Sequence, residues 1–339
     1  MRKEILFIAS LLCAGLMSSC SNGDQGGNNS DKKGCCLVPQ LTSMKCEFVP
    51  DGGKAIIYGK NLSGAVITFP DVETPAEIVS QNDTMVEVIV PEGTKDGRIR
   101  VSSPNGNSLS KFFFRDNRNT IVNFDKYLPT WGGWSPMDEE GELITGTLEM
   151  GDSITPFPNG AKLPEPCSKD YGFLYAKYSN AWSMNQTVWI QYVANPLEGG
   201  RGPVSVAGNV FEKYELEELA LKFEVFVPKE IPYKGIRTEI FFGPINSPDK
   251  HGRDFSPICF WKPYENTPDG FYTDSWTTIT IPLTEFCHNT SSDEPVANYN
   301  YKDKLKQATN FSFLQFGQPE GEPQIFMCVD NFRIVPIEK

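Results

Sequence analysis

The stretch MVEVIV, residues 85–90, alternates valine with other side chains in the way that a half-buried strand requires. Val86, Val88 and Val90 fall on one side, and Glu87 and Ile89 fall on the other. Successive side chains of a strand point to opposite faces of its sheet. The stretch therefore predicts a β-strand with one buried face and one partly solvated face.

Similar short apolar segments lie on both sides of this stretch. They are KAIIYG (54–59), AVITFP (65–70), GRIRVSSP (97–104) and KFFFRD (111–116). Glycine, proline, asparagine or aspartate separates them, and Asn61 and Gly106 supply turn residues that accept a positive φ. Strands that follow one another at roughly ten-residue intervals predict a small β-sandwich over residues 37–116.

Residues 117–339 are too long for a second module of that size and suit one larger β domain. In LALKFEVFVP (219–228), one row of residues alternates with Lys222, Glu224 and Phe226, as in a β-strand with two different faces. That row is Leu221, Phe223, Val225 and Val227. RTEIFFGP, WTTITIPL, FSFLQFG and IFMCVDNFRIV continue the series, and VFEKYELEELA (210–220) predicts about one turn of helix. The fold class predicted is all-β, with a jelly-roll-like β-sandwich after the smaller one.

The first 36 residues read as targeting and linker sequence. Arg2 and Lys3 precede a short apolar run, which predicts a signal peptide over residues 1–19. The segment ending at Cys20 resembles a bacterial lipobox, which implies lipidation of Cys20 and anchoring in the outer membrane, facing outward. An ordinary secretory signal is the alternative. The Gly/Asn/Ser/Asp-rich residues 20–36 predict a flexible tether.

Charge and cysteine content narrow the possible partners. A formal net charge of −12 disfavours binding of nucleic acid and polyanionic glycans and leaves binding of neutral ligands unaffected.

Of nine cysteines, seven lie beyond Cys20, an odd number that cannot all pair within the chain. The sequence has no pair of CxxC motifs, so a structural zinc site is not expected. Disulfides are possible in an exported chain, but the spacing leaves their connectivity open. The seven are Cys35, Cys36, Cys46, Cys167, Cys259, Cys287 and Cys328.

Two resemblances add to this reading. IIYGKNLSGAVITF (56–69) and PEGTKDGRIRVSSPNG (91–106) resemble the immunoglobulin-like TIG/IPT module, which implies a spacer over residues 37–116. FWKPY (260–264) and WTTITIPLTEF (276–286) resemble the C-terminal carbohydrate-binding domain of Bacteroidetes surface glycan-binding lipoproteins in the SusE/SusF position. That resemblance implies capture of a neutral β-glucan or hemicellulose for a SusC/SusD-like transporter.

Aromatic side chains in loops are the candidate glycan-binding residues. An indole or phenol ring offers a flat apolar surface to the C–H face of a sugar, and all six tryptophans lie beyond residue 117. For each candidate, packing inside the domain is the alternative, and for Trp189 and Trp276 core packing is the prediction. The candidates are Trp131 and Trp134 in PTWGGWSP, Trp182 in YSNAWSMNQ, and Trp261 and Tyr264 in FWKPY.

Charged residues in the larger domain provide weaker signals. Glu224 and Glu239, the latter near Arg237, are expected on outward sides of strands, where they could bond sugar hydroxyls. Asp330 resembles an acidic position that helps hold a structural calcium ion in many jelly-roll binding modules. Since Ca²⁺ takes six or more oxygen ligands and one aspartate does not supply them, no metal or other cofactor is predicted.

Catalysis is not expected. A glycosidase needs two carboxylates, but the Glu-x-Asp-x-x-Glu strand motif of jelly-roll glucanases does not occur. A Ser-His-Asp triad has only His251 and His288 to draw on, both in polar loop sequence, and no nucleophile elbow or phosphate loop is present. A secreted glycoside hydrolase and a protein-binding adhesive lipoprotein remain the alternatives.

Overall fold

The computed structural model describes residues 37–127, 131–132, 135–137, 158–177, 189–193, 210–211, 213–243, 257–288, 295, 310–315 and 324–337. For residues 131–132, 135–137, 158, 176–177, 189–193, 310 and 324 the backbone alone is described. The described chain consists of strands and short helical turns, which confirms the all-β prediction. Within this part, no helix is long and apolar enough to cross a bilayer.

The N-terminal unit is a sandwich of two antiparallel sheets. The four-stranded sheet has the order β1-β2-β5-β4, and the three-stranded sheet has the order β3-β6-β7. Val86, Val88 and Val90 are buried and Glu87 and Ile89 are half-buried, as predicted. The strands are β1 (Gln40–Met44), β2 (Lys54–Lys60), β3 (Val66–Thr68), β4 (Ile78–Gln81), β5 (Met85–Ile89), β6 (Arg100–Ser103) and β7 (Gly106–Leu109).

Turn chemistry in this unit follows the sequence. Asn61 has a φ of 56° and Gly106 a φ of 134°, so both predicted turn residues occupy positive-φ conformations. Gly59 permits a close approach of two strands, because a Cβ atom there would lie 2.0 Å from the carbonyl oxygen of Gln40 in β1. The assignment to the TIG/IPT family itself stays a prediction.

The C-terminal unit is a larger sandwich. One sheet has the order β10-β11-β18-β13-β16, with β8 also paired to β18, and the other has the order β15-β14-β17-β12-β9. We call them the six-stranded and the five-stranded sheet. The strands of the first are β8 (Thr120–Val122), β10 (Ser135–Met137), β11 (Tyr171–Lys177), β13 (Leu219–Phe226), β16 (Thr277–Pro282) and β18 (Gln324–Pro336). Those of the second are β9 (Trp131–Gly132), β12 (Trp189–Val193), β14 (Thr238–Gly243), β15 (Ile258–Trp261) and β17 (Asn310–Gln315).

Three short 3-10 turns punctuate these strands: η2 (Pro158–Gly160), η5 (Leu216–Glu218) and η7 (Leu283–Glu285). The turn η5 lies within the segment predicted to be helical and leads directly into β13. Between the two sheets, aromatic and aliphatic side chains form one core, in which Phe223 stacks on Phe332 with ring centroids 5.1 Å apart. This core fixes the two sheets face to face.

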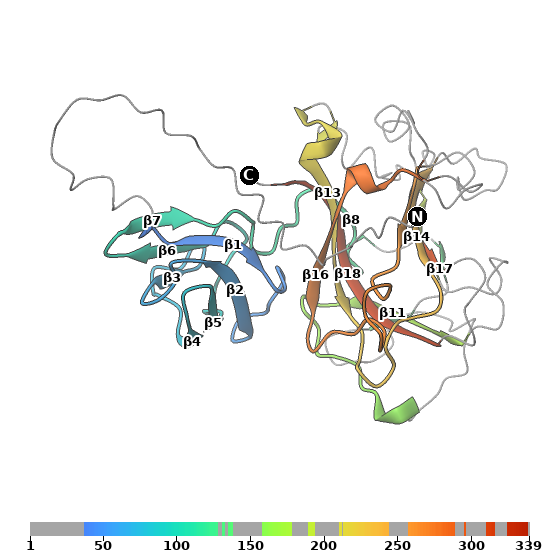
Figure 1. Ribbon diagram of the computed structural model, residues 1–339, viewed down its shortest axis with the longest axis horizontal. Coiled ribbons are helices and arrows are strands. Elements are labelled where there is room, and N and C mark those ends of the chain that lie inside the picture. Colours follow the sequence, from blue (N-terminus) through green and yellow to red (C-terminus); the bar gives the residue numbers. More distant parts are fainter. Residues whose placement is uncertain are drawn as a thin grey trace, which may run out of the picture.

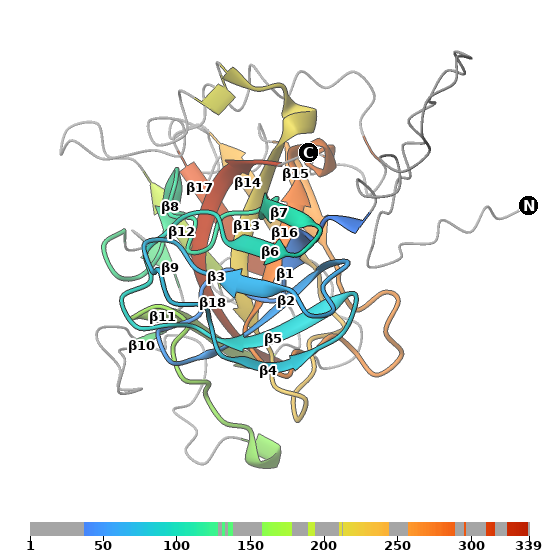
Figure 2. The same ribbon diagram turned by 90° about the vertical axis from the view of Figure 1, so that its left-hand side faces the viewer.

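The two units are packed together, and this burial corrects one prediction. The small sandwich lies against the outside of the six-stranded sheet, beside β16, β13 and β18 (Figures 1 and 2). A second core runs across the junction and includes Phe48 and Phe114 of the small unit with Trp276 and Phe326 of the large one. Both faces of the six-stranded sheet are therefore covered.

For this reason β13 does not show one solvated face. Glu224 is fully buried, although we expected it on an outward side of the strand, and Lys222 and Phe226 of the same row are half-buried. The alternation correctly grouped Lys222, Glu224 and Phe226 on one face of the strand. It did not show that the small sandwich, and not water, covers that face. A period of two shows which residues share a face and does not show what covers it.

Charged groups at the junction are paired. The buried Arg333 on β18 donates to Glu224 on β13 (2.9 Å) and to Glu47 of the small unit (2.7 Å). Lys222 donates to the second oxygen of Glu47 at 2.5 Å, and the Thr278 hydroxyl donates to Glu224 at 2.8 Å. We call Glu47, Lys222, Glu224 and Arg333 the junction cluster. Two cations balance two carboxylates, which is the condition for burying such charges.

Candidate functional site

The five-stranded sheet has two chemically different faces. Its inner face contributes Ile240, Phe242, Phe311 and Phe313 to the main core. Its outer face, which is directed away from the small sandwich (Figure 1), carries a separate apolar cluster. That cluster consists of Ile258 on β15, Phe241 on β14 and Leu314 on β17, with Phe260 packed against it.

Strand register extends the outer face across β12 and β9. Trp189 pairs with Leu314, and Gln191 pairs with Ser312 on one side and with Trp131 on the other. Residues directly opposite one another in adjacent strands share a face of the sheet. The backbone therefore places residues 131, 189 and 191 on the outer face, in line with Leu314 and Ser312.

A polar group flanks the aromatic surface. Arg237 lies with its guanidinium carbon 4.0 Å from the centroid of the Phe260 ring and donates to Glu239 on β14 at 2.7 and 3.0 Å. The imidazole of His288 stacks on the same ring, that of Phe260, with centroids 4.5 Å apart. Rings beside a charged hydrogen-bonding group suit a ligand with C–H faces and hydroxyl edges.

Trp261 contradicts the expectation of a surface platform. Its side chain is 9% exposed, and its indole stacks on Tyr233 with centroids 5.8 Å apart. Phe223 and Phe271 meet it edge-on at 5.5 and 5.7 Å. The reason is register: Trp261 pairs with Thr238, so it falls on the inner side of β15. The sequence FWKPY begins inside the strand, whereas we expected it to open a loop.

Tyr264 lies at the edge of the same core. Its ring meets Tyr233 edge-on at 5.4 Å, and the residue is half-buried against the main cluster. A half-buried ring keeps part of its surface in solvent, so binding by Tyr264 stays a prediction.

The other tryptophans divide into described and undescribed positions. Trp276 is buried, and its indole N–H donates to the Glu165 carbonyl at 2.7 Å, so the predicted core role is confirmed. Trp189 was predicted in the core, but its register partner is Leu314 of the outer face and not Phe313 of the inner face. Trp134, Trp182, His251 and Cys20 lie outside the described residues.

The acidic residues singled out from the sequence also lie inside the protein. Glu239 and Glu224 are fully buried in ion pairs with Arg237 and Arg333, so neither projects from a solvated face. Burial is the main cause that raises the pKa of Glu224 above its ordinary value, and it outweighs the opposing effect of Arg333.

Asp330 is held by protein groups. Ser168 donates to its carboxylate, and the Asn331 side chain does so at 2.9 Å. Burial raises the pKa of Asp330 well above its ordinary value. Among the described residues, no three His, Cys, Asp or Glu side chains are grouped so as to hold a metal ion.

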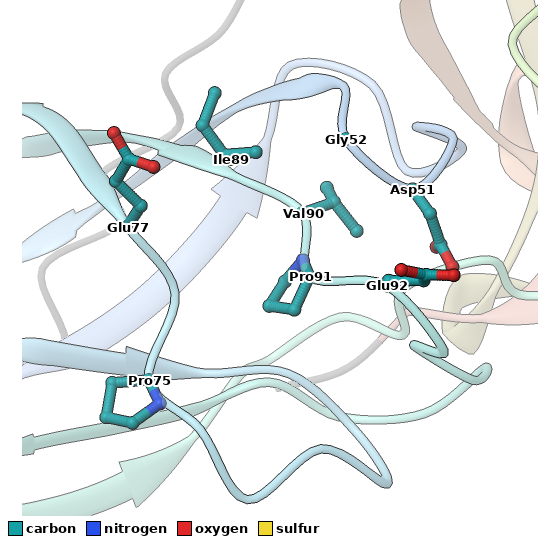
Figure 3. Close-up of a pocket in the computed structure, with 8 residues that line it drawn as sticks. All are labelled: Asp51, Gly52, Pro75, Glu77, Ile89, Val90, Pro91 and Glu92. Carbon is teal, nitrogen blue, oxygen red and sulfur yellow. The ribbon is translucent and has the colours of Figure 1, made fainter.

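A hollow in the small sandwich offers a second surface to compare. It has a volume of about 630 Å³ and opens between the turn at Asp51 and the segment Val90–Glu92 (Figure 3). Its lining has three carboxylates and two prolines and no aromatic ring, and the Asp51 carboxylate is bonded to Arg115 at 2.7 Å. Because the lining offers no aromatic ring for stacking, this hollow is poorly suited to bind a sugar.

The described rows of the outer face lack the carboxylate pair of a usual glycosidase. They hold one carboxylate, that of Glu239, which Arg237 occupies. Glycoside hydrolysis by the usual route takes two carboxylates on either side of the scissile bond. Phe241, Ile258, Leu314 and Glu239 are fully buried, so the half-buried Phe260 and Arg237 are among the described side chains of this region that can contact a neutral chain.

Solved structures of other proteins have a similar fold. A crystal structure of the surface glycan-binding protein PbSGBP-B from Prevotella bryantii is 18% identical, with a TM-score of 0.60 over 88% of this chain and 76% of that one. An SGBP-B from a complex xyloglucan utilization locus of Bacteroides uniformis is 18% identical, with a TM-score of 0.55 over 88% and 73% of the two chains. A structure with a xylogluco-oligosaccharide is 19% identical, with a TM-score of 0.56 over 88% and 58%.

At these identities the solved structures establish the fold, whereas the family rests on sequence. No curated protein compared with this chain matches it significantly. The family model for the xyloglucan-binding domain of surface glycan-binding protein B matches residues 114–336, which is most of the chain. The predicted relationship to Bacteroidetes surface glycan-binding proteins is thereby confirmed. This chain belongs to the family of the surface glycan-binding protein B xyloglucan-binding domain.

Proposed function

We propose that this protein is a non-catalytic binder of a neutral β-glucan or hemicellulose, with xyloglucan as the first candidate. The family match over residues 114–336 is the observation that carries the proposal. A structural relative solved with a xylogluco-oligosaccharide supports the same ligand class. A formal net charge of −12 also favours an uncharged glycan over a polyanion.

The glycan lies, in this proposal, across the outer face of the five-stranded sheet. Strand register, with residues 131 and 189 on this face, supports contact of the glycan with Trp131 and Trp189, and the half-buried Arg237 borders the face. Stacking on flat rings and hydrogen bonds to planar polar groups are the two contacts that a neutral sugar chain can make. Trp134, Trp182 and Tyr264 are further candidates for the same surface.

The location we propose is the cell exterior. Lipidation of Cys20 would anchor the chain in the outer membrane, and residues 20–36 would act as its tether. Because the small sandwich packs behind the six-stranded sheet, the five-stranded sheet remains on the far side of the molecule (Figure 1). A captured chain would pass from this face to a SusC/SusD-like transporter.

Affinity electrophoresis tests the proposal. The mature protein without its lipid is run through gels that contain xyloglucan, mixed-linkage β-glucan, xylan or a polyuronate. We expect retardation in xyloglucan or another neutral glucan and none in the polyuronate. The variants Trp131→Ala, Trp134→Ala and Trp182→Ala run beside it, with Tyr272→Ala as the matched control.

Tyr272 suits this control because it is an exposed aromatic residue (43%) away from the five-stranded sheet. Its ring lies near Lys229, which follows β13 of the six-stranded sheet. Loss of retardation in a folded tryptophan variant but not in the control supports the site. Migration unaffected by every neutral glucan would contradict the function, and shortened glycan products would indicate an enzyme.

A further inference from the structure

Two buried thiols meet at the junction of the two sandwiches. Cys46 follows β1 in the small unit, and Cys167 precedes β11 in the large unit, 6% and 4% exposed respectively. Both belong to the core that runs across the junction, and Cys46 is close enough to contribute to the raised pKa of Cys167. As free thiols, Cys46 donates to the Phe48 carbonyl at 2.8 Å and Cys167 donates to Asp330 at 3.6 Å.

The backbone on both sides of this pair is fixed to the same strand end. Thr278 in β16 donates its amide to the Lys45 carbonyl (2.8 Å), and its hydroxyl accepts from the Glu47 amide (2.7 Å), so residues 45–47 are fixed around Cys46. Trp276 donates to the Glu165 carbonyl two residues before Cys167. The two segments thus approach one another over Trp276–Thr278.

We propose that Cys46 and Cys167 form a disulfide that joins the two sandwiches covalently in the exported protein. Each thiol loses one proton and the pair loses two electrons, which reduce the disulfide of a thiol-disulfide oxidant to two thiols. An exported chain meets such oxidants, whereas a cytosolic one does not keep disulfides. The bond would close a loop from residue 46 to residue 167 and restrict the unfolded chain.

Burial defines when the bond can form. It raises the pKa of Cys167 well above its ordinary value, so the folded, reduced protein holds little of the reactive thiolate. Oxidation is therefore expected during folding, before the junction closes around the two sulfur atoms. Once formed, the bond is inaccessible to reductants for the same reason.

A second pair follows from an independent observation. Ile258 and His288 exchange both backbone hydrogen bonds at 3.0 Å in an antiparallel bridge. The next pair along the ladder, Cys259 and Cys287, is then a non-hydrogen-bonded pair, with Cα atoms about 4.5 Å apart in such ladders. That separation lies within the range of disulfides. With both bonds formed, Cys328 remains as a buried thiol in the described part of the chain.

Peptide mapping tests both bonds. The mature chain is refolded in a glutathione redox buffer, its free thiols are alkylated in denaturant, and it is digested with trypsin without reduction. Cys46 lies in CEFVPDGGK (46–54) and Cys167 in LPEPCSK (163–169), each with a single cysteine. We expect a cross-linked species of these two peptides that disappears on reduction. Cys259 and Cys287 share the peptide 254–302, which should lack two hydrogen atoms and carry no alkyl group.

Thermal unfolding separates a specific bond from general oxidation. Oxidation should raise the midpoint temperature of unfolding by about 5–15 °C in the wild type and in Cys328→Ser. In Cys167→Ser this rise should be smaller, because the Cys46–Cys167 bond cannot form. Recovery of 46–54 and 163–169 as separately alkylated peptides after refolding would overturn the junction bond. Cross-links of either peptide to Cys328 would overturn the pairing.

Discussion

Replacing Arg333 with methionine should destabilise the protein severely. The guanidinium is fully buried and donates to Glu224 at 2.9 and 3.1 Å, to Glu47 at 2.7 Å and to the Asn331 carbonyl at 2.8 Å. Without it, Glu47 keeps its ion pair with Lys222, and Glu224 keeps the hydrogen bond from the Thr278 hydroxyl. Removing one member of a buried ion pair costs about 3–5 kcal/mol, so we expect that loss in the free energy of unfolding.

The pH dependence provides a second signature. Arg333 opposes the rise in the pKa of Glu224 that burial causes, so the variant should raise that pKa further. A carboxyl group with a raised pKa in the folded state loses stability as pH rises from its unfolded value, about 4.3, through the folded value. The destabilisation caused by Arg333→Met should therefore be smaller at pH 5 than at pH 8.

Urea unfolding at both pH values measures these effects. Lys262→Met is the matched control, because its partner Glu265 is 53% exposed and such a pair contributes about 0–1 kcal/mol. In Arg333→Met with Glu224→Gln, the glutamine can still accept from Thr278, and most of the loss should be recovered. A loss below about 1 kcal/mol for Arg333→Met, or no recovery in the double variant, would refute the reasoning.

Three further predictions concern other buried positions. Trp261→Ala should cost about 3–5 kcal/mol in urea unfolding, with glycan affinity of the folded protein unchanged, and a selective loss of affinity would return Trp261 to the binding site. Because the pKa of Asp330 is raised, the free energy of unfolding should fall as pH rises above about 4, by up to about 1.4 kcal/mol per pH unit. Asp330→Asn should remove this part of the pH dependence, and an unchanged slope in the variant would contradict the raised pKa. Gly172→Ala should prevent normal folding, because the new Cβ would lie 2.3 Å from the ring of Phe124, and native circular dichroism with unchanged stability would contradict this.

Local patterns in the sequence were enough to predict the strands. The alternation around Val86 and the turn residues Asn61 and Gly106 are properties of a few neighbouring residues, and the structure follows them. The same period shows which residues share a face. It could not show that the small sandwich covers the second face of β13, because the partner, Glu47, lies far away in the sequence.

The candidate site was predictable in kind but not in detail. Aromatic enrichment beyond residue 117 pointed to the larger sandwich, which the family match supports. Trp261 was expected at the entry to a loop but lies on the inner side of β15, because the facing of a strand residue depends on pairing, here with β14. Trp189 was expected in the core, and its pairing with Leu314 of the outer face could not be predicted from neighbouring residues either. A count of alternate positions from Ile258, which starts β15, would have placed Trp261 with Cys259 on the inner side.

Calorimetric titration with a xylogluco-oligosaccharide tests the central claim most directly. Trp189→Ala removes the indole from a position that strand register puts on the outer face of the five-stranded sheet, and Tyr272→Ala removes an exposed ring elsewhere. We predict binding at least about tenfold weaker for Trp189→Ala, equivalent to about 1.4 kcal/mol, with the Tyr272→Ala variant within about twofold of the wild type. Equal affinity for all three proteins would contradict binding on the outer face.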